Sequence, residues 1–277
     1  MTSVHRAAGA DSPGFDPSKL NAARIYDYWL GGKDNFAADR EAAEQVIAFA
    51  PEVPRLAREN RKFLGRVVRF LAAAGIRQFI DIGTGLPTQG HVHEVLRAVA
   101  PDAHVAYVDN DPVVLVHARA LLQDSEHVGV IQGDLRDPDA IVKDPQLREL
   151  IDLERPVAVL LLAVLHLVGD DAQAAHAVAR LSAAMAPGSY LAISHAVCRP
   201  DDDNEDITNM LKLYNAGPMK DANRRTLRAA EEVLAFFGDL EFVAPGFVPL
   251  ADWRPDAKER PHAHASIWSV GGVARKR

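Results

Sequence analysis

An acid and two glycines follow one another at the end of an apolar stretch, an arrangement that can bind part of a nucleotide. The stretch Phe79-Ile80-Asp81-Ile82 runs directly into Gly83-Thr84-Gly85. Because glycine has no side chain, the backbone of such a turn can approach a ligand at the carboxyl end of a buried parallel strand. Dinucleotide-binding folds carry a third glycine where this sequence has Thr88. The carboxylate of Asp81 suits a ligand with positive charge better than one with phosphates, so the turn predicts a nucleotide cofactor that is cationic near Asp81.

Two further acids follow the next two predicted strands. Asp109 ends the stretch 104–109, 24 residues after Gly85, and Asp134 follows the stretch 128–132. An acid in the first position is placed to accept hydrogen bonds from ribose hydroxyls. An acid in the second is placed to accept one from the exocyclic amine of adenine. Since the carboxyl ends of parallel strands meet at one edge of a sheet, we expect Asp81, Asp109 and Asp134 to surround a single adenosine-containing ligand.

The elements that must position these acids alternate between strand and helix. Apolar runs of strand length are separated by segments of helical periodicity. The run 156–166 is almost uninterrupted, as expected for a strand buried on both faces. This alternation predicts an α/β fold with a doubly wound parallel sheet. The predicted strands cover 76–81, 104–109, 128–132, 156–166 and 189–196, and the helices between them begin near Thr88, Asp111 and Asp170 or Asp171.

The segments on either side of this alternation differ from it. Residues 1–18 show no periodicity and are interpreted as a mobile lead-in. Apolar residues at helical spacing predict helices over 39–50 and 54–74. A polar loop over 199–205 and helical patterns over 207–214 and 221–237 predict an insertion above the active site. The stretches 242–250 and 264–270 predict two final strands that pair antiparallel, because no crossover helix separates them. The expected organisation is a lead-in over 1–18, a helical cap over 19–74 and a sheet domain over 75–277 with a helical insertion about 199–237.

The amino-acid composition argues against some classes of binding partner. The chain of 277 residues has 31 Lys and Arg against 38 Asp and Glu, a net charge of -7. This acidity argues against nucleic acid, whose binding requires Lys and Arg clustered on one face. Cys198 is the only cysteine, which excludes an intrachain disulfide, and no apolar run is long enough to cross a membrane. We expect a cytoplasmic protein without a nucleic-acid or membrane partner, whose oligomeric state the sequence does not indicate.

A dense cluster of aromatic residues precedes the first long helix. The segment 21–36 contains Tyr26, Tyr28 and Trp29 ahead of the pair Gly31-Gly32. One interpretation is a short helix that caps an edge of the core with its aromatic side chains. The other is a lid over the cofactor, in which Tyr26 lies near the ligand and the two glycines act as a hinge or as backbone contacts.

Five basic residues lie along the helix predicted over 54–74. We interpret them as a solvated face rather than an anion site, because acids are interspersed nearby. They are Arg58, Arg61, Lys62, Arg66 and Arg69.

These motifs together resemble a known family. The acid-glycine turn, the acid after the second strand and Gly133-Asp134-Leu135 after the third are similar to class I S-adenosylmethionine-dependent methyltransferases, which have a seven-stranded Rossmann-like sheet ending in an antiparallel hairpin. The segment 21–39, with Phe247-Val248-Pro249-Leu250 and Trp253-Arg254-Pro255, looks like an actinobacterial S-adenosyl methyltransferase family formerly known as a domain of unknown function. The resemblance implies a methyltransferase that uses S-adenosylmethionine, and it implies no particular substrate.

The resemblance also implies which residues bind the cofactor. The turn after the first strand, with Asp81 behind it, would hold the methionine end, Asp109 the ribose, and Asp134 with the backbone of Leu135 the adenine. Ala163 would border the methyl group, and the aromatic segment would supply the lid. The implied cofactor-binding residues are Tyr26, Gly31, Gly32, Asp81, Gly83, Thr84, Gly85, Asp109, Asn110, Asp134, Leu135 and Ala163.

Methyl transfer from a sulfonium is an in-line displacement that depends more on alignment than on a base. Alignment can supply about 7 to 11 kcal/mol, whereas a general base contributes about 10²- to 10⁴-fold. The candidate bases are His166 and His195, at the ends of the fourth and fifth predicted strands. A structural histidine bonded to the backbone is the competing interpretation of each. We expect the acceptor to be a small molecule in a mostly apolar, enclosed cavity.

Two other classes of function share most of these features. A nicotinamide oxidoreductase would share the sheet and the ribose acid, but would favour glycine in place of Thr88 and no acid at Asp81. A protein that binds the cofactor without catalysis, as a sensor or partner, would differ only in its acceptor pocket. No metal site is expected, since His91 and His93 would face apart on a helix and His262 and His264 lack a third ligand.

Overall fold

The computed structural model describes residues 18–86, 90–122, 126–197, 228–256 and 269–277. The predicted lead-in up to residue 17, Thr88, residues 199–227 of the predicted insertion and the first part of the last predicted strand lie outside these ranges. None of the helices in the described ranges is both long enough and apolar enough to cross a membrane.

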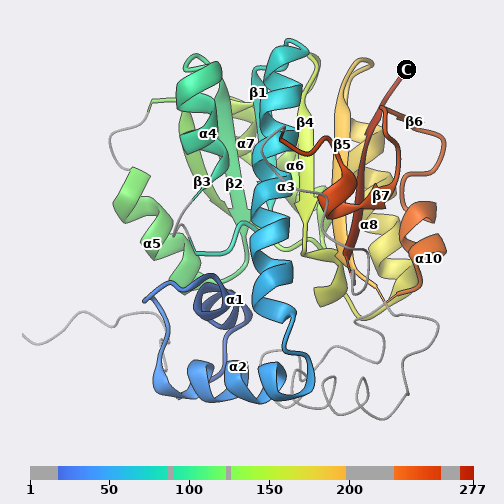
Figure 1. Ribbon diagram of the computed structural model, residues 1–277. Coiled ribbons are helices and arrows are strands. Elements are labelled where there is room, and N and C mark those ends of the chain that lie inside the picture. The colour runs from blue at the N-terminus through green and yellow to red at the C-terminus, as the bar shows by residue number, and fades with distance from the viewer. Residues whose placement is uncertain (1–17, 87–89, 123–125, 198–227, 257–268) are drawn as a thin grey trace, which may run out of the picture.

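In the part of the chain that the structure describes, eight strands form one sheet (Figure 1). The order is β3-β2-β1-β4-β5-β8-β6, with β7 also paired to β8, and the first five strands are mutually parallel. The predicted doubly wound α/β fold is confirmed, with one short strand more than the seven expected. The strands are β1 (Gln78–Ile82), β2 (His104–Asp109), β3 (Val128–Gln132), β4 (Ala158–Leu162), β5 (Tyr190–Ala196), β6 (Glu241–Phe242), β7 (Val248–Pro249) and β8 (Ser269–Arg275).

The carboxyl-terminal strands differ in detail from the prediction. Where one strand was predicted over 242–250, β6 and β7 are separated by a turn that contains Pro245 and Gly246. Proline has no N–H to donate to a ladder, which explains the interruption. Strand β8 continues to Arg275, beyond the predicted end at 270, and its main antiparallel partner is β5. The expected antiparallel pairing is therefore present, but β8 lies between β5 and β6 rather than in a simple hairpin.

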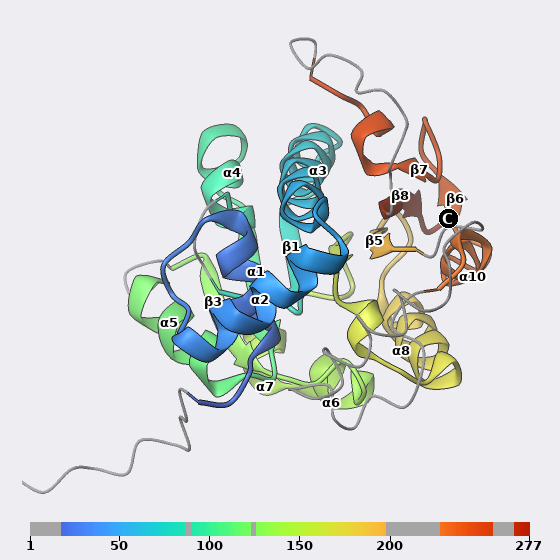
Figure 2. The ribbon, with the colours of Figure 1, turned by 60° about the horizontal axis from the view of Figure 1, so that its bottom comes forward.

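Helices cover both faces of the sheet, as Figure 2 shows from the end of the strands. Helices α3 and α4 pack on one face through Phe63, Val67 and Leu96, and α6, α7 and α8 pack on the other through Ile141, Leu147 and Val178. The helices are α1 (Ala22–Leu30), α2 (Ala37–Phe49), α3 (Val53–Ala73), α4 (Val92–Val99), α5 (Pro112–Leu122), α6 (Pro138–Lys143), α7 (Pro145–Leu150), α8 (Asp171–Ala184) and α10 (Ala230–Ala235), with short 3₁₀ turns η1 (Leu165–Leu167) and η2 (Leu250–Asp252).

Successive residues of β1 face opposite layers, and this sets the direction of its acid. Phe79 packs in the layer of α3 and α4, whereas Ile80 and Ile82 pack in the layer of α6, α7 and α8. Because side chains alternate along a strand, Asp81 faces the same layer as Phe79. The acid at the end of β1 is thereby directed toward α3.

The N-terminal helices lie at the carboxyl edge of the parallel strands (Figure 1). Helix α1 is capped by Asn21, whose side-chain oxygen accepts from the Arg24 amide at 2.9 Å. Ile25 and Trp29 of α1 pack with Ala43 and Val46 of α2 in a small separate core. The segment 21–36 thus contains a helix that packs its aromatic residues, as the first interpretation expected.

Candidate functional site

One cavity of about 520 Å³ opens at the carboxyl ends of β1 to β5. Helices α1, α2 and α3 form its opposite wall, with Trp29, Val46 and Leu56 among the lining residues. All of the predicted site residues line this cavity except Gly31 and Gly32. Those that do are Tyr26, Asp81, Gly83, Thr84, Gly85, Asp109, Asn110, Asp134, Leu135, Ala163, His166 and His195.

Asp81 is buried in the wall of the cavity, and its carboxylate accepts no hydrogen bond from any residue that the structure describes. Its pKa is raised to about 7, mainly by burial; the Arg61 guanidinium opposes this shift, and the charge of Asp109 contributes to it less. An unsolvated carboxylate that faces a cavity favours a ligand with a positive group.

The glycine turn after β1 requires both of its glycines. Gly83 has a φ of +73°, and an added Cβ would lie 2.2 Å from Val164 Cγ2. Gly85 has a φ of +67°, and an added Cβ there would meet no atom. A positive φ strains any residue with a side chain, so Gly83 is required for packing and Gly85 for its backbone conformation. Thr84 stabilises the turn by donating from Oγ1 to the Asp81 carbonyl at 2.9 Å.

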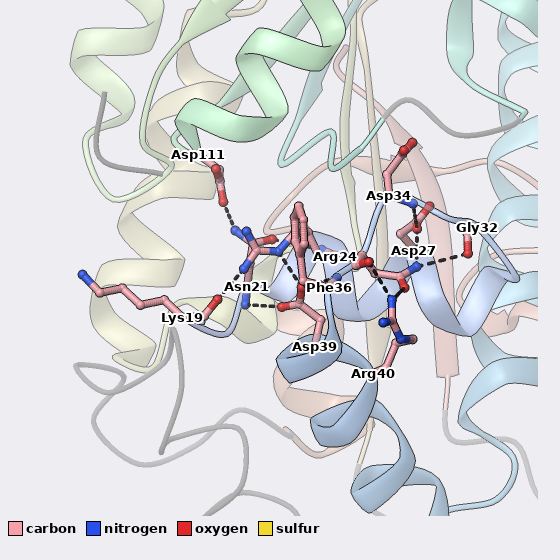
Figure 3. A network of polar contacts seen from close by, with 11 residues as sticks. Lys19, Asn21, Arg24, Asp27, Gly32, Asp34, Phe36, Asp39, Arg40 and Asp111 are labelled. Carbon is pink, nitrogen blue, oxygen red and sulfur yellow. Dashed lines mark hydrogen bonds and ion pairs between the residues drawn. The ribbon is translucent and has the colours of Figure 1, made fainter. Parts of the chain in front are cut away.

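Asp109, at the end of β2, holds the glycine turn in place. Its Oδ2 accepts from the Gly85 amide at 3.0 Å and its Oδ1 from the Asp111 amide at 2.9 Å. Burial raises its pKa, and these two amides oppose the shift. Asn21 donates to Asp111 from the N-terminal segment, as Figure 3 shows. Both carboxylate oxygens of Asp109 retain lone pairs that can accept from hydroxyl groups.

Asp134 follows β3 and is more exposed than the other two acids. Arg136 donates to it from Nε at 2.9 Å, and Asn110 donates from Nδ2 to its Oδ2 at 3.1 Å. The hydrogen bonds from Arg136 lower the pKa of Asp134 to about 2. Asp134 is therefore ionised near neutral pH and is oriented by Arg136 and Asn110.

Ala163 follows β4 in a backbone conformation that is unusual for alanine, with a φ of +53°. Its amide donates to Ser194 Oγ at 3.0 Å, and Ser194 Oγ donates to Asn60 Oδ1 at 2.5 Å. Asn60 in turn donates to the Tyr26 hydroxyl at 3.0 Å, and that hydroxyl donates to the Ala57 carbonyl at 3.1 Å. A chain of hydrogen bonds thus links α1 and α3 to β5 and to the end of β4. The sequence analysis did not identify Asn60 or Ser194, because isolated polar residues carry no recognisable pattern.

His166 and His195 lie together at the end of β4 and β5, with ring centroids 5.7 Å apart. Both nitrogens of His195 are engaged, because Nδ1 bonds to the Ala196 carbonyl at 2.5 Å and Arg228 donates to Nε2 at 3.2 Å. Burial, followed by His166 and Arg228, lowers the pKa of His195 to about 3. This places His195 in the structural interpretation rather than the catalytic one.

His166 lines the cavity, and its buried Nδ1 has no hydrogen-bond partner in the described ranges. Burial and the nearby Arg228 lower its pKa to about 4, so the ring is neutral near pH 7. A neutral imidazole beside a cavity can accept a proton.

Gly31 and Gly32 are not part of the cavity wall, contrary to expectation. Gly31 ends α1 with a φ of +83°, and its amide donates to the Tyr28 carbonyl at 2.9 Å. A Cβ on Gly32 would lie 1.9 Å from Asp27 Oδ1. Asp27 also accepts from Asn35 Nδ2 at 2.8 Å (Figure 3). Gly31 is therefore explained by its left-handed conformation at the end of α1, and Gly32 by its close packing against Asp27.

A buried ion pair joins α1 to α2. Arg24 Nε donates to Asp39 Oδ2 at 2.7 Å, and both side chains are almost inaccessible to solvent. Asp39 also accepts from the amides of Asn21 at 3.0 Å and Phe36 at 2.9 Å (Figure 3). These bonds hold the start of α1 against α2 and so fix the helical wall of the cavity.

The interpretation of the basic residues of α3 as a solvated face is wrong for two of them. Arg66 is buried and donates to the Leu250 carbonyl at 2.6 Å and to the Trp253 carbonyl at 2.8 Å. Arg61 lines the cavity. Periodicity could have indicated this, because Arg61 lies four residues after Ala57 and three before Leu64, which also line the cavity.

The prediction that His91 and His93 face apart is also wrong. His91 precedes α4 instead of lying within it, and the two rings stack with centroids 6.2 Å apart. His93 Nδ1 bonds to the Tyr107 hydroxyl at 2.7 Å. Within the described ranges, no three His, Cys, Asp or Glu side chains are grouped so as to hold a metal ion.

Comparison with known protein families and solved structures identifies relatives of this chain. A family model described as S-adenosyl methyltransferase matches residues 8–277. A crystal structure of a methyltransferase candidate from Thermobifida fusca YX is 40% identical, with a TM-score of 0.85 over 96% of this chain and 98% of that one. A DUF574 family protein from Streptomyces avermitilis MA-4680 is 39% identical, with a TM-score of 0.86 over 95% and 99% of the two chains. No curated protein matches the sequence.

Proposed function

The chain belongs to the S-adenosyl methyltransferase family, and we propose on that premise that it methylates a small, largely apolar molecule bound between its sheet and its N-terminal helices. Because the chain belongs to this family, it is an S-adenosylmethionine-dependent enzyme. The acceptor, the in-line course of the reaction, the residue roles and a cytoplasmic location are parts of the proposal. The main observation in support of this proposal is that Asp81, Asp109, Asp134 and His166 all line one cavity.

The residues of the cavity fit the cofactor. Asp81 is a buried carboxylate without a hydrogen-bond partner in the described ranges, which suits the ammonium of the methionine moiety. Gly85 has open space on the side where a Cβ would lie, which lets the ligand approach the turn. Asp109 would accept from the ribose hydroxyls, and Asp134 with the Leu135 backbone would contact the adenine.

The helical side of the cavity supports a small acceptor. Its lining there is mainly apolar, from α1, α2 and α3, and includes Trp29, Val46, Val53, Leu56 and Leu64. The volume of about 520 Å³ lies within the range of small-molecule pockets, roughly 300 to 1,000 Å³. Arg61 and Arg136 are the only basic side chains in the described wall, so nothing there resembles the basic groove that a nucleic acid needs.

The bound cofactor would supply an electrophilic methyl group on a sulfonium that is already a good leaving group. The protein must then align the acceptor, exclude water and receive a proton where the acceptor loses one. The chain of hydrogen bonds from Tyr26 through Asn60 and Ser194 to Ala163 fixes the wall where the acceptor would meet the methyl group. His166 is the side chain placed to receive a proton, since it is neutral and borders the cavity.

Calorimetric titration with S-adenosylmethionine, its demethylated product and NAD tests the cofactor assignment. We expect binding of both adenosyl compounds and none of NAD, and we expect Asp109→Ala to weaken adenosyl binding by about tenfold or more, because hydrogen bonds to a charged group are worth about 1.5 to 3 kcal/mol. Release of the demethylated product with a panel of small aromatic and aliphatic acceptors tests catalysis. Tight cofactor binding without turnover on any acceptor would instead favour the non-catalytic sensor.

A further inference from the structure

Two side chains of opposite charge, Arg61 and Asp81, line the same cavity. Arg61 is close enough to oppose the raised pKa of Asp81, yet the two side chains form no ion pair or hydrogen bond. Arg61 has no hydrogen bond or ion pair with any residue in the described ranges, and its Nε is buried without a partner. Arg136, the other basic residue in the wall, is by contrast paired with Asp134.

A buried hydrogen-bond donor on a charged group that has no acceptor lowers the stability of the fold. The arrangement around Arg61 therefore needs a physical explanation. Leaving a charged donor without an acceptor costs more free energy than leaving a neutral one. A bound ligand that carries both an anionic and a cationic group would relieve both side chains at once. The cavity that Arg61 and Asp81 line therefore offers one positive and one negative group, as a site for a zwitterion requires.

The position of Arg61 places this site at the glycine turn. Its stem packs beside Gly90, where an added Cβ would lie 3.5 Å from Arg61 Cγ. Its guanidinium lies over the ring of Tyr26, with Cζ 6.0 Å from the ring centroid. Asp81 and the turn 83–85 line the same cavity. Arg61 thus lies against Tyr26 of α1 and beside Gly90 in the loop after β1, and it lines the same cavity as the glycine turn.

We propose that Arg61 binds the carboxylate of the methionine moiety while Asp81 binds its ammonium, so that the pair selects cofactors with an intact amino-acid end. This inference rests on the proposed assignment of the cofactor site and adds Arg61 to it. A guanidinium presents its donors in a planar fork that matches a carboxylate, which gives recognition of shape as well as of charge.

The wild-type protein tests the proposal through two ligands that differ in one group. Decarboxylated S-adenosylmethionine keeps the ammonium and the sulfonium but lacks the carboxylate. We expect calorimetry to show that it binds roughly 10- to 100-fold more weakly than S-adenosylmethionine, the range expected for a charge-assisted bidentate contact. Equal affinity for the two ligands would overturn the inference without any variant.

Substitution of Arg61 assigns the discrimination to this residue. Arg61→Met should weaken binding of S-adenosylmethionine by roughly 10- to 100-fold and leave binding of the decarboxylated ligand within about threefold, so that the preference disappears. Arg58→Met is the matched control, because Arg58 is exposed on the same helix and does not line the cavity. A preference that survives in Arg61→Met, or an equal loss for both ligands, would contradict the assignment.

The failure of this inference can be separated from failure of the proposed function. If the wild-type protein binds no adenosyl ligand, both are wrong. If it binds S-adenosylmethionine and Arg61→Met binds it equally well, only the role of Arg61 is wrong. Circular dichroism and the melting temperature of each variant establish that it is folded, and Arg61→Gln provides a second variant that retains hydrogen-bond donors without the charge.

Discussion

At the scale of the residue, the site consists of acids in different electrostatic states. Asp134 is held ionised by Arg136, whereas burial raises the pKa of Asp81 to about 7. Asp81 lies near the end of β1 and Asp134 follows β3, but the first is buried and the second is partly exposed. The same residue type can therefore serve a cationic ligand group at one strand end and a neutral polar group at another.

The raised pKa of Asp81 predicts that cofactor affinity depends on pH. A ligand ammonium favours the ionised carboxylate, so binding must displace a proton at pH values below about 7. We expect the affinity for S-adenosylmethionine to rise about fivefold between pH 6 and pH 7, a window in which the ligand amine stays protonated. Calorimetry in buffers of different ionisation enthalpy measures the proton release. Asp81→Asn should bind more weakly and lose this dependence, and an unchanged dependence in that variant would exclude Asp81 as its source.

The same pKa has the opposite consequence for stability without ligand. A carboxyl group whose pKa is raised by folding stabilises the protein below its unfolded pKa, and this contribution is lost as the pH rises toward about 7. We expect Asp81→Asn to melt at a higher temperature than the wild type at pH 8 and to lose this advantage at pH 4. A melting temperature that is lower than that of the wild type at both pH values would contradict this explanation.

The two histidines should respond differently to substitution. His166→Asn is expected to lower kcat by about 10²-fold, the lower end for a general base, with little change in cofactor affinity. His195→Asn should act mainly on the free energy of unfolding, because it disturbs the acceptor of Arg228. Steady-state kinetics and urea denaturation of both variants separate these effects. Equal loss of kcat in both would show that the pair acts as one unit.

At the scale of the element, α3 connects the cavity to the sheet. One face of it lines the cavity with Asn60, Arg61 and Leu64, and other residues pack in the core on β1 and β4. Through Asn60 it is hydrogen-bonded to both α1 and β5. Helix α3 thereby positions the side of the cavity proposed to bind the acceptor relative to the ends of the strands.

Removal of the central member of this chain should cost stability. Asn60→Leu leaves the Ser194 hydroxyl and the Tyr26 hydroxyl without Asn60, and we expect the free energy of unfolding to fall by about 1 to 3 kcal/mol. Urea denaturation measures this loss. Because Ser194 donates to Asn60, Ser194→Ala should cost less in the Asn60→Leu background than in the wild type, whereas additive losses would show that the two side chains are not coupled.

The described residues on either side of 198–227 pair with each other. Val197 and Arg228, which flank residues 198–227, form an isolated parallel β-bridge. Arg228 is buried and donates to the Leu165 carbonyl at 2.9 Å and to the Val168 carbonyl at 2.7 Å. Arg228 is therefore hydrogen-bonded to the segment that contains His166.

At the scale of the whole molecule, helix α3 of the N-terminal part and the sheet share a core. Phe63, Val67, Val68 and Leu71 of α3 are fully buried beside strands β1 and β4. The division between a cap over 19–74 and a domain over 75–277 stays a prediction about sequence organisation. The packing indicates that the two parts do not fold independently.

Truncation tests this dependence. We expect a chain that begins at residue 75 to be unfolded or aggregated, because removal of α3 exposes the apolar face that it covers. Far-ultraviolet circular dichroism and size-exclusion chromatography measure the outcome. A chain that begins at residue 18 is the control and should melt cooperatively, while a folded, monomeric product from residue 75 would show that the sheet needs no helical cover from α3.

Local pattern sufficed for the features that depend on neighbours in the chain. The parallel strands and the acids at their ends follow from apolar runs that stop at a polar residue, and a parallel sheet brings such ends together whatever the sequence elsewhere. The glycine turn was predictable for the same reason, since the positive φ of Gly83 and Gly85 is a property of the backbone there. The resemblance to a family then supplied the cofactor, which the shared sheet alone leaves open between several nucleotides.

The tertiary structure decided everything that depends on residues distant in the chain. It placed β8 beside β5, left Gly31 and Gly32 outside the cavity lining, engaged both nitrogens of His195 and brought Arg61 into the wall of the cavity that Asp81 lines. Helical periodicity states which residues share a face, but it does not state what that face meets. A basic residue on α3 is solvated or functional according to whether water or the end of β1 lies opposite, and only folding of the whole chain determines that.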